Sequence, residues 1–316
     1  MQQKIVSPSI VIVGSMNLDH TFSTPRIPQP GETVQATRVT TSRGGKGGNA
    51  AIAARRAGGR VAMIGCLGDD DAGRHYRSHL QREGINTDGV VISQQIPTGA
   101  AFITVDDVGE NTIVVHSGAN ACVGLSDIDA SATAIATADL LLMQFEIPLE
   151  VVAQSADIAR KSNVVVIINP SPWNDLFRES KIHVDIIIVN ETEAMNLTQQ
   201  SIEWLRENPL SVCDLFCCSA IVVTRGNRST LIFQRGQMLQ EVMPPTVVPR
   251  DTVGAGDAFA GAFAVKVAEG DSLLEAVAFA NTAGALSTLV CGAQSAIPTR
   301  HEILARLMSK AIGTKE

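Results

Sequence analysis

The sequence predicts an α/β protein built around a mostly parallel β-sheet with helices on both faces. Two observations predict this fold class. Short runs rich in Val, Ile and Leu recur along the 316 residues, and helical patterns lie between most of them. The runs are apolar almost throughout, which is typical of parallel strands buried on both faces. The length is enough for a substantial core.

The elements follow in a regular order. Candidate strands lie at 9–15, 60–65, 140–144, 163–169, 184–190 and 219–226. Helical patterns occupy 48–58, 71–84, 149–162 and 201–208. After residue 255 the pattern is mainly helical, over 257–269, 272–289 and 299–311. Strands that alternate with helices favour crossover connections between parallel neighbours.

Two segments break this alternation. Residues 20–42 and 98–117 contain strand and turn patterns without helices. Within the second segment, DDVGEN (106–111) lies between two β runs and indicates a hairpin. We expect the two segments to pair as a small secondary sheet that covers a site.

The composition argues against several classes of function. The net charge is −7, from 25 basic and 32 acidic side chains, and no basic block is present, so we expect no nucleic-acid partner. Apolar runs are too short for a bilayer and no signal-peptide cleavage pattern is found, so we expect a cytoplasmic protein without a membrane partner. The scattered cysteines and histidines lack the spacing of a disulfide framework or a zinc site.

Polar side chains gather where parallel strands would end, and ligands of open α/β sheets bind at that edge. The segments concerned are GSMNLD (14–19), GGKGGNAA (44–51), Glu146, NPSP (169–172), NETEA (190–194) and TRGNRS (224–229). We therefore expect a ligand site there. Each segment alone is also explained by turn or helix-capping chemistry.

The stretch DTVGAGDAFAGAF (251–263) places Gly254, Ala255 and Gly256 before Asp257 and an apolar helix. Free amides and the positive end of the helix dipole favour an anion at such a turn. Asp257 could cap the helix or take a proton. The chain lacks the G-x-x-x-x-G-K-[ST] loop, and no G-x-G-x-x-G follows the first strand, which argues against a P-loop enzyme and a dinucleotide-dependent oxidoreductase.

GGKGGNAAIAA (44–54) and DTVGAGDAFAGAF resemble the two signatures of the ribokinase-like carbohydrate kinases, the phosphofructokinase-B family. The similarity extends from VGSMNLDH (13–20) to GAQSAIP (292–298), with SGAN (117–120) and NPSP as matching details. The resemblance implies a single α/β kinase domain over 1–316, a three-layer sandwich with a small β lid from about 20–42 and 98–117.

The resemblance also implies roles for individual residues. The family's sugar-binding positions match Asn17, Asp19, Gly45, Lys46, Gly47, Asn49 and Glu146. The positions that organise Mg²⁺ and the phosphates of ATP match Asn190 and Glu193, while those of the nucleotide loop and the adenine end match Thr224, Gly226, Ser229 and Asn281. Asp257 matches the catalytic base at the substrate, and the amides of Gly254, Ala255 and Gly256 match the anion hole beside the nucleotide.

A monovalent cation, typically K⁺, is a further expectation from the family. Its ligands match the carboxylate of Asp251 and the carbonyls of Val253, Ser287, Val290 and Gly292. The chain departs from the family pattern at Ala296, where a serine hydroxyl is expected, and at Ser229, where a glycine is expected. These departures suggest weaker K⁺ activation and altered nucleotide affinity.

The implied activity is ATP-dependent transfer of the γ-phosphoryl group to a primary hydroxyl, and the sugar-side motifs favour O5 of D-ribose. Deoxyribose, a ketohexose, a keto-deoxy sugar acid and a nucleoside stay open as substrates. A sugar-binding homologue without turnover is an alternative from another class. We also expect a homodimer through the β lid, which carries the apolar residues Phe22, Ile27, Val34, Val39, Ile103, Val105, Ile113 and Val115.

Overall fold

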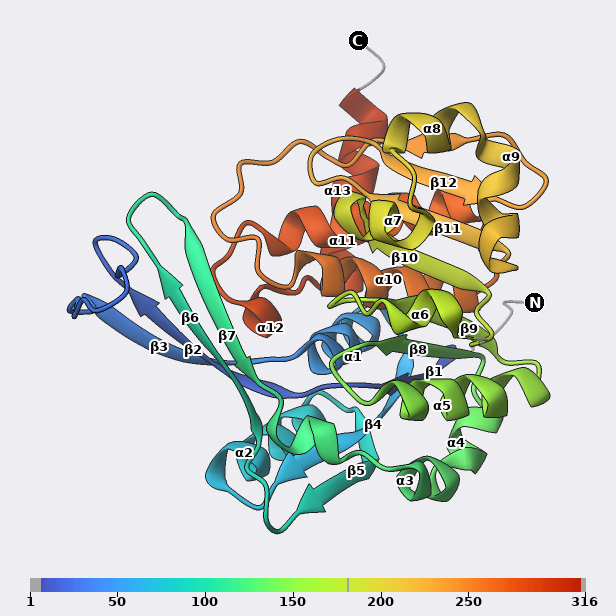
Figure 1. Cartoon of the computed structure of the whole chain (residues 1–316). Coiled ribbons are helices and arrows are strands. Elements are labelled where there is room, and N and C mark those ends of the chain that lie inside the picture. Colours follow the sequence, from blue (N-terminus) through green and yellow to red (C-terminus); the bar gives the residue numbers. More distant parts are fainter. Residues whose placement is uncertain (1–6, 181, 314–316) are drawn as a thin grey trace.

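The computed structural model describes residues 7–180 and 182–313. Its main body is a nine-stranded sheet between two layers of helices (Figure 1). The strands run in the order β13 (Gln240–Val242), β12 (Thr230–Gln234), β11 (Ala220–Thr224), β10 (Ile186–Asn190), β9 (Val165–Asn169), β8 (Leu140–Gln144), β1 (Ser9–Val13), β4 (Arg60–Gly68) and β5 (Asn86–Ser93).

The strand pairing is parallel from β5 to β11, which confirms the predicted α/β sheet. β12 and β13 add two antiparallel strands at one edge. The strands β5, β12 and β13 were not predicted from the sequence. No helix separates β11 from β12, and β5 mixes polar residues and a glycine with its apolar ones, so neither follows the pattern of an apolar run bounded by helices.

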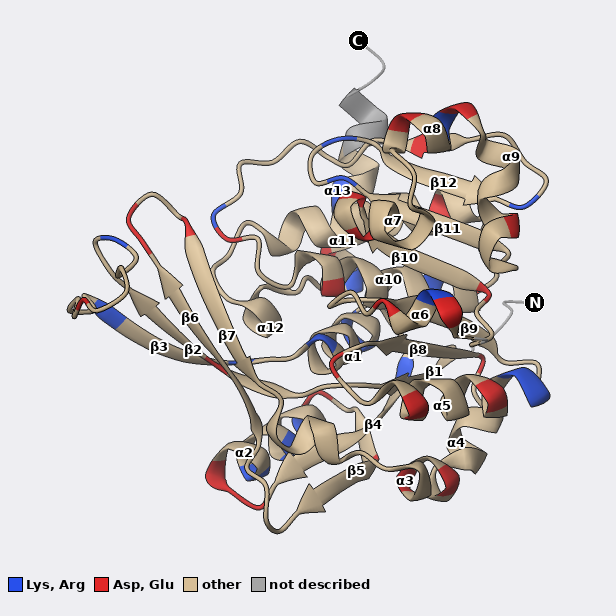
Figure 2. Ribbon diagram, viewed as in Figure 1, with Lys and Arg blue, Asp and Glu red and all other residues tan. Residues whose placement is uncertain are grey.

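Alternate residues of the strands face two separate cores. Ile10 and Ile12 of β1 pack into one, and Val11 and Val13 pack into the other. The first core lies under α1 (Lys46–Arg56), α2 (Asp71–Arg82), α10 (Ala255–Ala268), α11 (Leu273–Ser287) and α13 (Arg300–Gly313). Figure 2 shows that the Lys, Arg, Asp and Glu positions lie mainly on helices and loops, while the central strands carry almost none.

The second core lies under the helices on the opposite face, most of which are short. These are η1 (Gly118–Cys122), α3 (Leu125–Ala130), α4 (Ala132–Ala136), α5 (Leu149–Lys161), α6 (Leu176–Glu179), α7 (Glu191–Thr198), α8 (Ile202–Glu207), α9 (Pro209–Val212) and η2 (Cys213–Phe216). None of the helices in the described part of the chain combines the length and apolar character that a membrane span requires.

A second sheet of four strands projects from the main body (Figure 1). We call it the small sheet, and its order is β3 (Arg38–Gly44), β2 (Asn17–Ser23), β6 (Gly99–Val105) and β7 (Asn111–His116). β2 pairs with β6 in parallel, so the two β segments noted in the sequence form one sheet. The small sheet leaves the body directly after β1 and returns to it at α1.

The helices that carry the two signature motifs, α1 and α10, pack closely against each other. Gly261 makes this approach possible, since a Cβ at this position would lie 2.4 Å from the Ala50 carbonyl oxygen. The first turns of α1 and α10 thereby come together at the edge of the sheet where its parallel strands end.

Candidate active site

Asp257 lies in the first turn of α10, where the local sequence forces a sharp backbone turn. Gly254 caps the helix with φ 76° in the left-handed region, which a side chain would strain. A Cβ on Gly254 would also lie 3.1 Å from the Ala293 Cβ. The small residues therefore keep bulky side chains away from a helix N-terminus, which is a favourable place for an anion, although the Ala255 amide donates to the Thr252 carbonyl at 3.3 Å.

The Asp257 carboxylate is buried, with 7% exposure, and is held by two side chains of α1. Asn49 donates its Nδ2 to Asp257 Oδ2 at 2.8 Å, and Lys46 Nζ lies 3.8 Å from Asp257 Oδ1. Burial raises the pKa of Asp257 above its ordinary value, and the Lys46 charge opposes this rise. The charge of Asp257 in turn raises the pKa of Lys46, so the ammonium stays protonated beside the acid.

The glycines of the first signature let α1 approach the backbone that leads from β1 into β2. Gly45 has φ 84°, and a Cβ there would lie 2.6 Å from the Asn17 backbone nitrogen. A Cβ on Gly47 would lie 2.7 Å from the Gly14 carbonyl carbon. These glycines act through close packing, which brings Lys46 to the pocket beside Asn17.

The smaller of two pockets at this edge has a volume of about 410 Å³ and contains three predicted sugar-site residues: Asn17, Lys46 and Glu146. Its other lining residues are Val115, Ser117, Asn120, Ala121, Phe145, Ile147, Pro148 and Pro172. Glu146 Oε2 accepts hydrogen bonds from Ser15 Oγ at 2.5 Å and from the Lys46 amide at 3.2 Å. The carboxylate is thereby fixed at the pocket wall.

Asn120 also lines this pocket, although it was not predicted as a site residue from the sequence. Its Nδ2 donates to Asn17 Oδ1 at 2.7 Å, and its Oδ1 accepts from the Met16 amide at 2.8 Å. The segment SGAN (117–120) directly follows β7 of the small sheet, and its polar residues at the end of a strand could have indicated that Asn120 belongs to the site. Because Asn17 Oδ1 already accepts the hydrogen bond from Asn120, the NH₂ group of Asn17 is the part of this side chain that can donate to a ligand.

Asp19 lies on β2, buried at 7% exposure, and is part of a group of three acids. Its carboxylate lies over Gly44, where a Cβ would come within 1.9 Å of Oδ2. Burial raises the pKa of Asp19 to about 7, and the charges of Glu146 and Asp257 add to the rise. Asp19 therefore changes its charge near neutral pH.

The larger pocket has a volume of about 580 Å³ and lies between the loop after β11 and the helices α10 and α11. Its lining includes the predicted residues Thr224, Gly226, Ala255, Gly256 and Asn281. Apolar residues, polar residues and one arginine complete it: Arg225, Asn227, Thr230, Met243, Pro244, Pro245, Thr246, Val247, Pro249, Thr252, Phe259, Gly284, Ala285 and Thr288. Such a mixed lining suits a ligand with a flat apolar part and a polar tail.

Two predicted nucleotide-site residues are engaged within the protein. Ser229 is not one of the described residues that line the larger pocket. Its Oγ donates to Glu241 Oε2 at 2.5 Å. Asn281 lines the pocket, but its amide accepts from Thr230 Oγ1 at 2.7 Å and donates to the Val242 carbonyl at 3.1 Å. Asn281 is thus rigidly placed at the pocket wall.

Asp257 adjoins both pockets. Its neighbours Ala255 and Gly256 line the larger one, and its ion-pair partner Lys46 lines the smaller one. A buried acid in the first turn of a helix, placed between two pockets, is suited to moving a charged group from a ligand in one to a ligand in the other. Residues 7–300 match the pfkB family of carbohydrate kinases.

The chain belongs to this family. It is 38% identical over 298 residues to the ribokinase of Haemophilus influenzae, covering 94% of this chain and 97% of that protein. It is 34% identical over 306 residues to the ribokinase of Schizosaccharomyces pombe, covering 93% and 96%.

Solved structures agree with this assignment. A structure of Arabidopsis thaliana ribokinase complexed with ribose and ATP superposes with a TM-score of 0.84 at 30% identity, covering 96% of this chain and 99% of that one. A ribokinase from Cryptococcus neoformans in complex with ADP gives 0.83 at 32% identity, covering 95% and 100%. The predicted family and the ribokinase-like fold are confirmed.

Asn190 and Glu193 form the N-terminal cap of α7 in this kinase. Glu193 donates its amide to Asn190 Oδ1 at 2.8 Å, and the Asn190 amide donates to Glu193 Oε2 at 3.0 Å. The capping role considered for this segment is therefore present. Glu193 is also buried at 8% exposure, and its charge helps to raise the pKa of Asp257, so it belongs to the same centre.

Asp251 joins the two segments from which the cation ligands are predicted. Its Oδ1 accepts from the Val253 amide at 3.0 Å, and its Oδ2 accepts from the Gly292 amide at 2.8 Å. Ser287 uses its hydroxyl to donate to the Gly284 carbonyl at 2.8 Å. Ala296, at the position of the missing serine, is buried and presents only a methyl group.

Proposed function

We propose that this carbohydrate kinase transfers the γ-phosphoryl group of ATP to O5 of D-ribose, giving ribose 5-phosphate and ADP. The observation that carries the proposal is the position of Asp257 between the two pockets, with Lys46 and Asn49 holding its carboxylate. The relatives named ribokinase match almost the full chain, and one of the similar structures holds ribose and ATP.

Asp257 would act as the general base. The sugar hydroxyl would give its proton to an Asp257 oxygen while it attacks the γ-phosphorus. Burial raises the pKa of Asp257 and brings its basicity closer to the pH of the reaction. The amides of Gly254, Ala255 and Gly256 would hold the charge on the transferring group, because phosphoryl transfer depends on positioning and electrostatic stabilisation.

The smaller pocket would bind the sugar through groups that suit vicinal hydroxyls. Asn17 presents a donor and Glu146 presents an acceptor in fixed directions. Asp19 is not among the described residues that line this pocket, and its carboxyl group would reach the sugar from β2. Among the described lining residues Lys46 is the one cationic side chain, and it already pairs with Asp257. This charge balance favours a neutral sugar over a keto-deoxy sugar acid.

Two kinds of metal ion would support the reaction. The oxygens of Asn190 and Glu193 are hard donors of the type that Mg²⁺ and its bound waters prefer, and the ion would neutralise phosphate charge. The carboxylate of Asp251 and the carbonyls of Val253, Ser287, Val290 and Gly292 fit a weakly hydrated monovalent cation such as K⁺. Ala296 supplies no side-chain oxygen, so we expect weaker K⁺ activation than a serine would allow.

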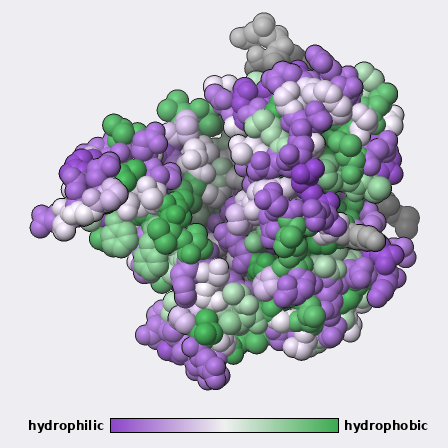
Figure 3. Space-filling view, in the orientation of Figure 1, coloured by the Kyte–Doolittle hydropathy of each residue, from purple (hydrophilic) through white to green (hydrophobic). Residues whose placement is uncertain are grey.

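The small sheet would cover the sugar and form a homodimer. Val39, Ile113 and Val115 are half exposed, at 57%, 51% and 49%, and Phe102 and Val114 join them at 43% and 63%. Figure 3 shows such apolar side chains on this sheet. Ile103, which we expected to be exposed, is buried. A monomeric mass by light scattering at micromolar concentration would contradict the dimer.

The function is tested by measuring ADP release with Mg-ATP across a panel of sugars, with and without K⁺. We expect ribose to be preferred and Asp257→Asn to lower kcat by roughly 10²- to 10⁴-fold, the usual contribution of a general base. Asp107→Asn is the control, because this aspartate is exposed in the small sheet's hairpin. If another sugar is preferred, the substrate assignment is wrong. If Asp257→Asn keeps full activity, the base assignment is wrong.

A further inference from the structure

The loop 225–229 between β11 and β12 forms part of the wall of the larger pocket. Arg225, Gly226 and Asn227 contribute lining atoms. Gly226 has φ 61°, and Arg228 donates its amide to the Arg225 carbonyl at 3.1 Å, so the loop is a tight turn. A turn of this kind has few backbone contacts of its own, and its position depends on what holds its side chains.

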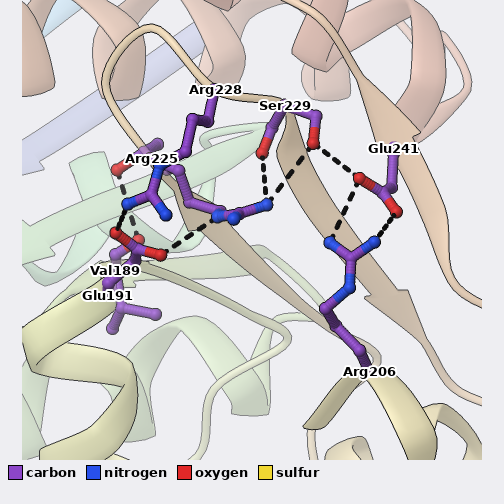
Figure 4. A network of polar contacts seen from close by, with 8 residues as sticks. Val189, Glu191, Arg206, Arg225, Arg228, Ser229 and Glu241 are labelled. Carbon is purple, nitrogen blue, oxygen red and sulfur yellow. Dashed lines mark hydrogen bonds and ion pairs between the residues drawn. The ribbon is translucent and has the colours of Figure 1, made fainter. Parts of the chain in front are cut away.

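Glu191, the first residue of α7, holds this loop through two arginines (Figure 4). Arg225 donates its Nε to Glu191 Oε1 at 3.1 Å, and Arg228 donates its Nη2 to Glu191 Oε2. The Arg225 side chain is 11% exposed, whereas that of Arg228 is 57% exposed. The two ion pairs therefore share one carboxylate but differ in burial.

The network continues to the far side of the loop (Figure 4). Arg225 Nη1 lies 3.4 Å from both Ser229 O and Ser229 Oγ, and Ser229 Oγ donates to Glu241. Arg206 of α8 donates two hydrogen bonds to the Glu241 carboxylate. Arg225 thus connects the start of the loop with its end and with α7, the helix that begins with Asn190 and Glu193.

We propose that Arg225 and Glu191 are positioning residues for the nucleotide, which fix loop 225–229 against the first turn of α7. The inference rests on the proposed assignment of the larger pocket to ATP. The contact sets the distance between the loop that lines the pocket and the helix that would organise the phosphates. Arg225 acts here through its buried, multiply bonded guanidinium, because a planar fork with several donors holds one geometry.

The test compares Arg225→Met with Arg228→Met in direct calorimetric titrations of Mg-ATP and of ADP, without sugar. Both variants remove one arginine charge that pairs with the Glu191 carboxylate, and both keep an apolar side chain of similar length. We expect Arg225→Met to weaken nucleotide binding by roughly tenfold, which matches the lower end of a charge-assisted hydrogen bond. Arg228→Met should change it by less than about twofold, as exposed ion pairs contribute little.

Four further results decide the inference. Glu191→Gln should weaken binding as Arg225→Met does, and the double variant should add little to either. In Arg225→Met the KM for ATP should rise while the KM for ribose stays unchanged. Arg225→Lys should bind the nucleotide more tightly than Arg225→Met does. Equal losses in Arg225→Met and Arg228→Met would overturn the proposal, because bulk charge would then explain the effect.

The outcomes also separate this proposal from the proposed function. A wild-type chain that binds ATP but phosphorylates no sugar refutes the ribose kinase and leaves the nucleotide titrations valid. A melting temperature of Arg225→Met within about 2 °C of the wild type shows that the loss is local. If that variant unfolds, Ser229→Ala, which removes the hydroxyl beside Arg225, is titrated in its place and should also weaken binding.

Discussion

Replacing Asp19 by Asn should stabilise the protein at alkaline pH although it damages the sugar site. The Asp19 carboxyl is buried with Glu146 and Asp257 nearby, and its pKa is raised from 3.8 to about 7. The folded state therefore holds this proton more tightly than the unfolded chain does. As the pH rises from 4 to 7, the unfolded chain gives up the proton first, and stability is lost over that interval.

The size of the effect follows from the shift. A rise of about three pKa units at about 1.4 kcal/mol each gives roughly 4 kcal/mol lost above pH 7, and none below pH 4. Between pH 5 and pH 8 the expected loss is about 2–3 kcal/mol. Asn has the same shape and no charge, so the variant should not show this loss.

The assay is urea unfolding of the wild type and Asp19→Asn at pH 5 and pH 8. The free energy of unfolding of the variant, relative to the wild type, should increase by about 2–3 kcal/mol between these pH values. Asp107→Asn, at an exposed position, should show no such change. A difference between variant and wild type that is the same at both pH values would refute the reasoning, because Asp19 would then not be a desolvated acid.

Three other perturbations follow from the structure. Tyr76→Phe removes a fully buried hydroxyl that makes two hydrogen bonds, so the free energy of unfolding should fall by about 1–3 kcal/mol; an unchanged urea midpoint would mean that the partners find other bonds. Gly45→Ala should raise the KM for ribose and lower stability by more than Gly236→Ala, because both glycines have positive φ but the second faces open space; equal losses of stability would contradict the close-packing argument. Asp251→Asn should raise the K⁺ concentration for half-maximal activity several-fold; K⁺ titrations that coincide with those of the wild type would contradict the cation site.

Much of the fold could be predicted because it is written in local patterns. Apolar runs such as 140–144 and 184–190 became the buried strands β8 and β10, and the helical patterns gave α1, α2, α5 and α10. The edge strands β12 and β13 were missed because they are antiparallel and follow a short loop instead of a helix. The glycines of both signatures indicated close approach, and the structure shows what they approach.

The sequence by itself determined the fold class and the family, and it is the source of the proposed role of Asp257, since each depends on neighbouring residues in a recognisable order. Tertiary structure alone decided how these residues act. Asn49 and Asp257 are 208 positions apart and form one hydrogen bond, and Asn120 reaches Asn17 across 103 positions. The raised pKa of Asp19 depends on burial and on charges brought by distant segments. Because electrostatic energy depends on distance and solvent exposure in space, no local pattern encodes it.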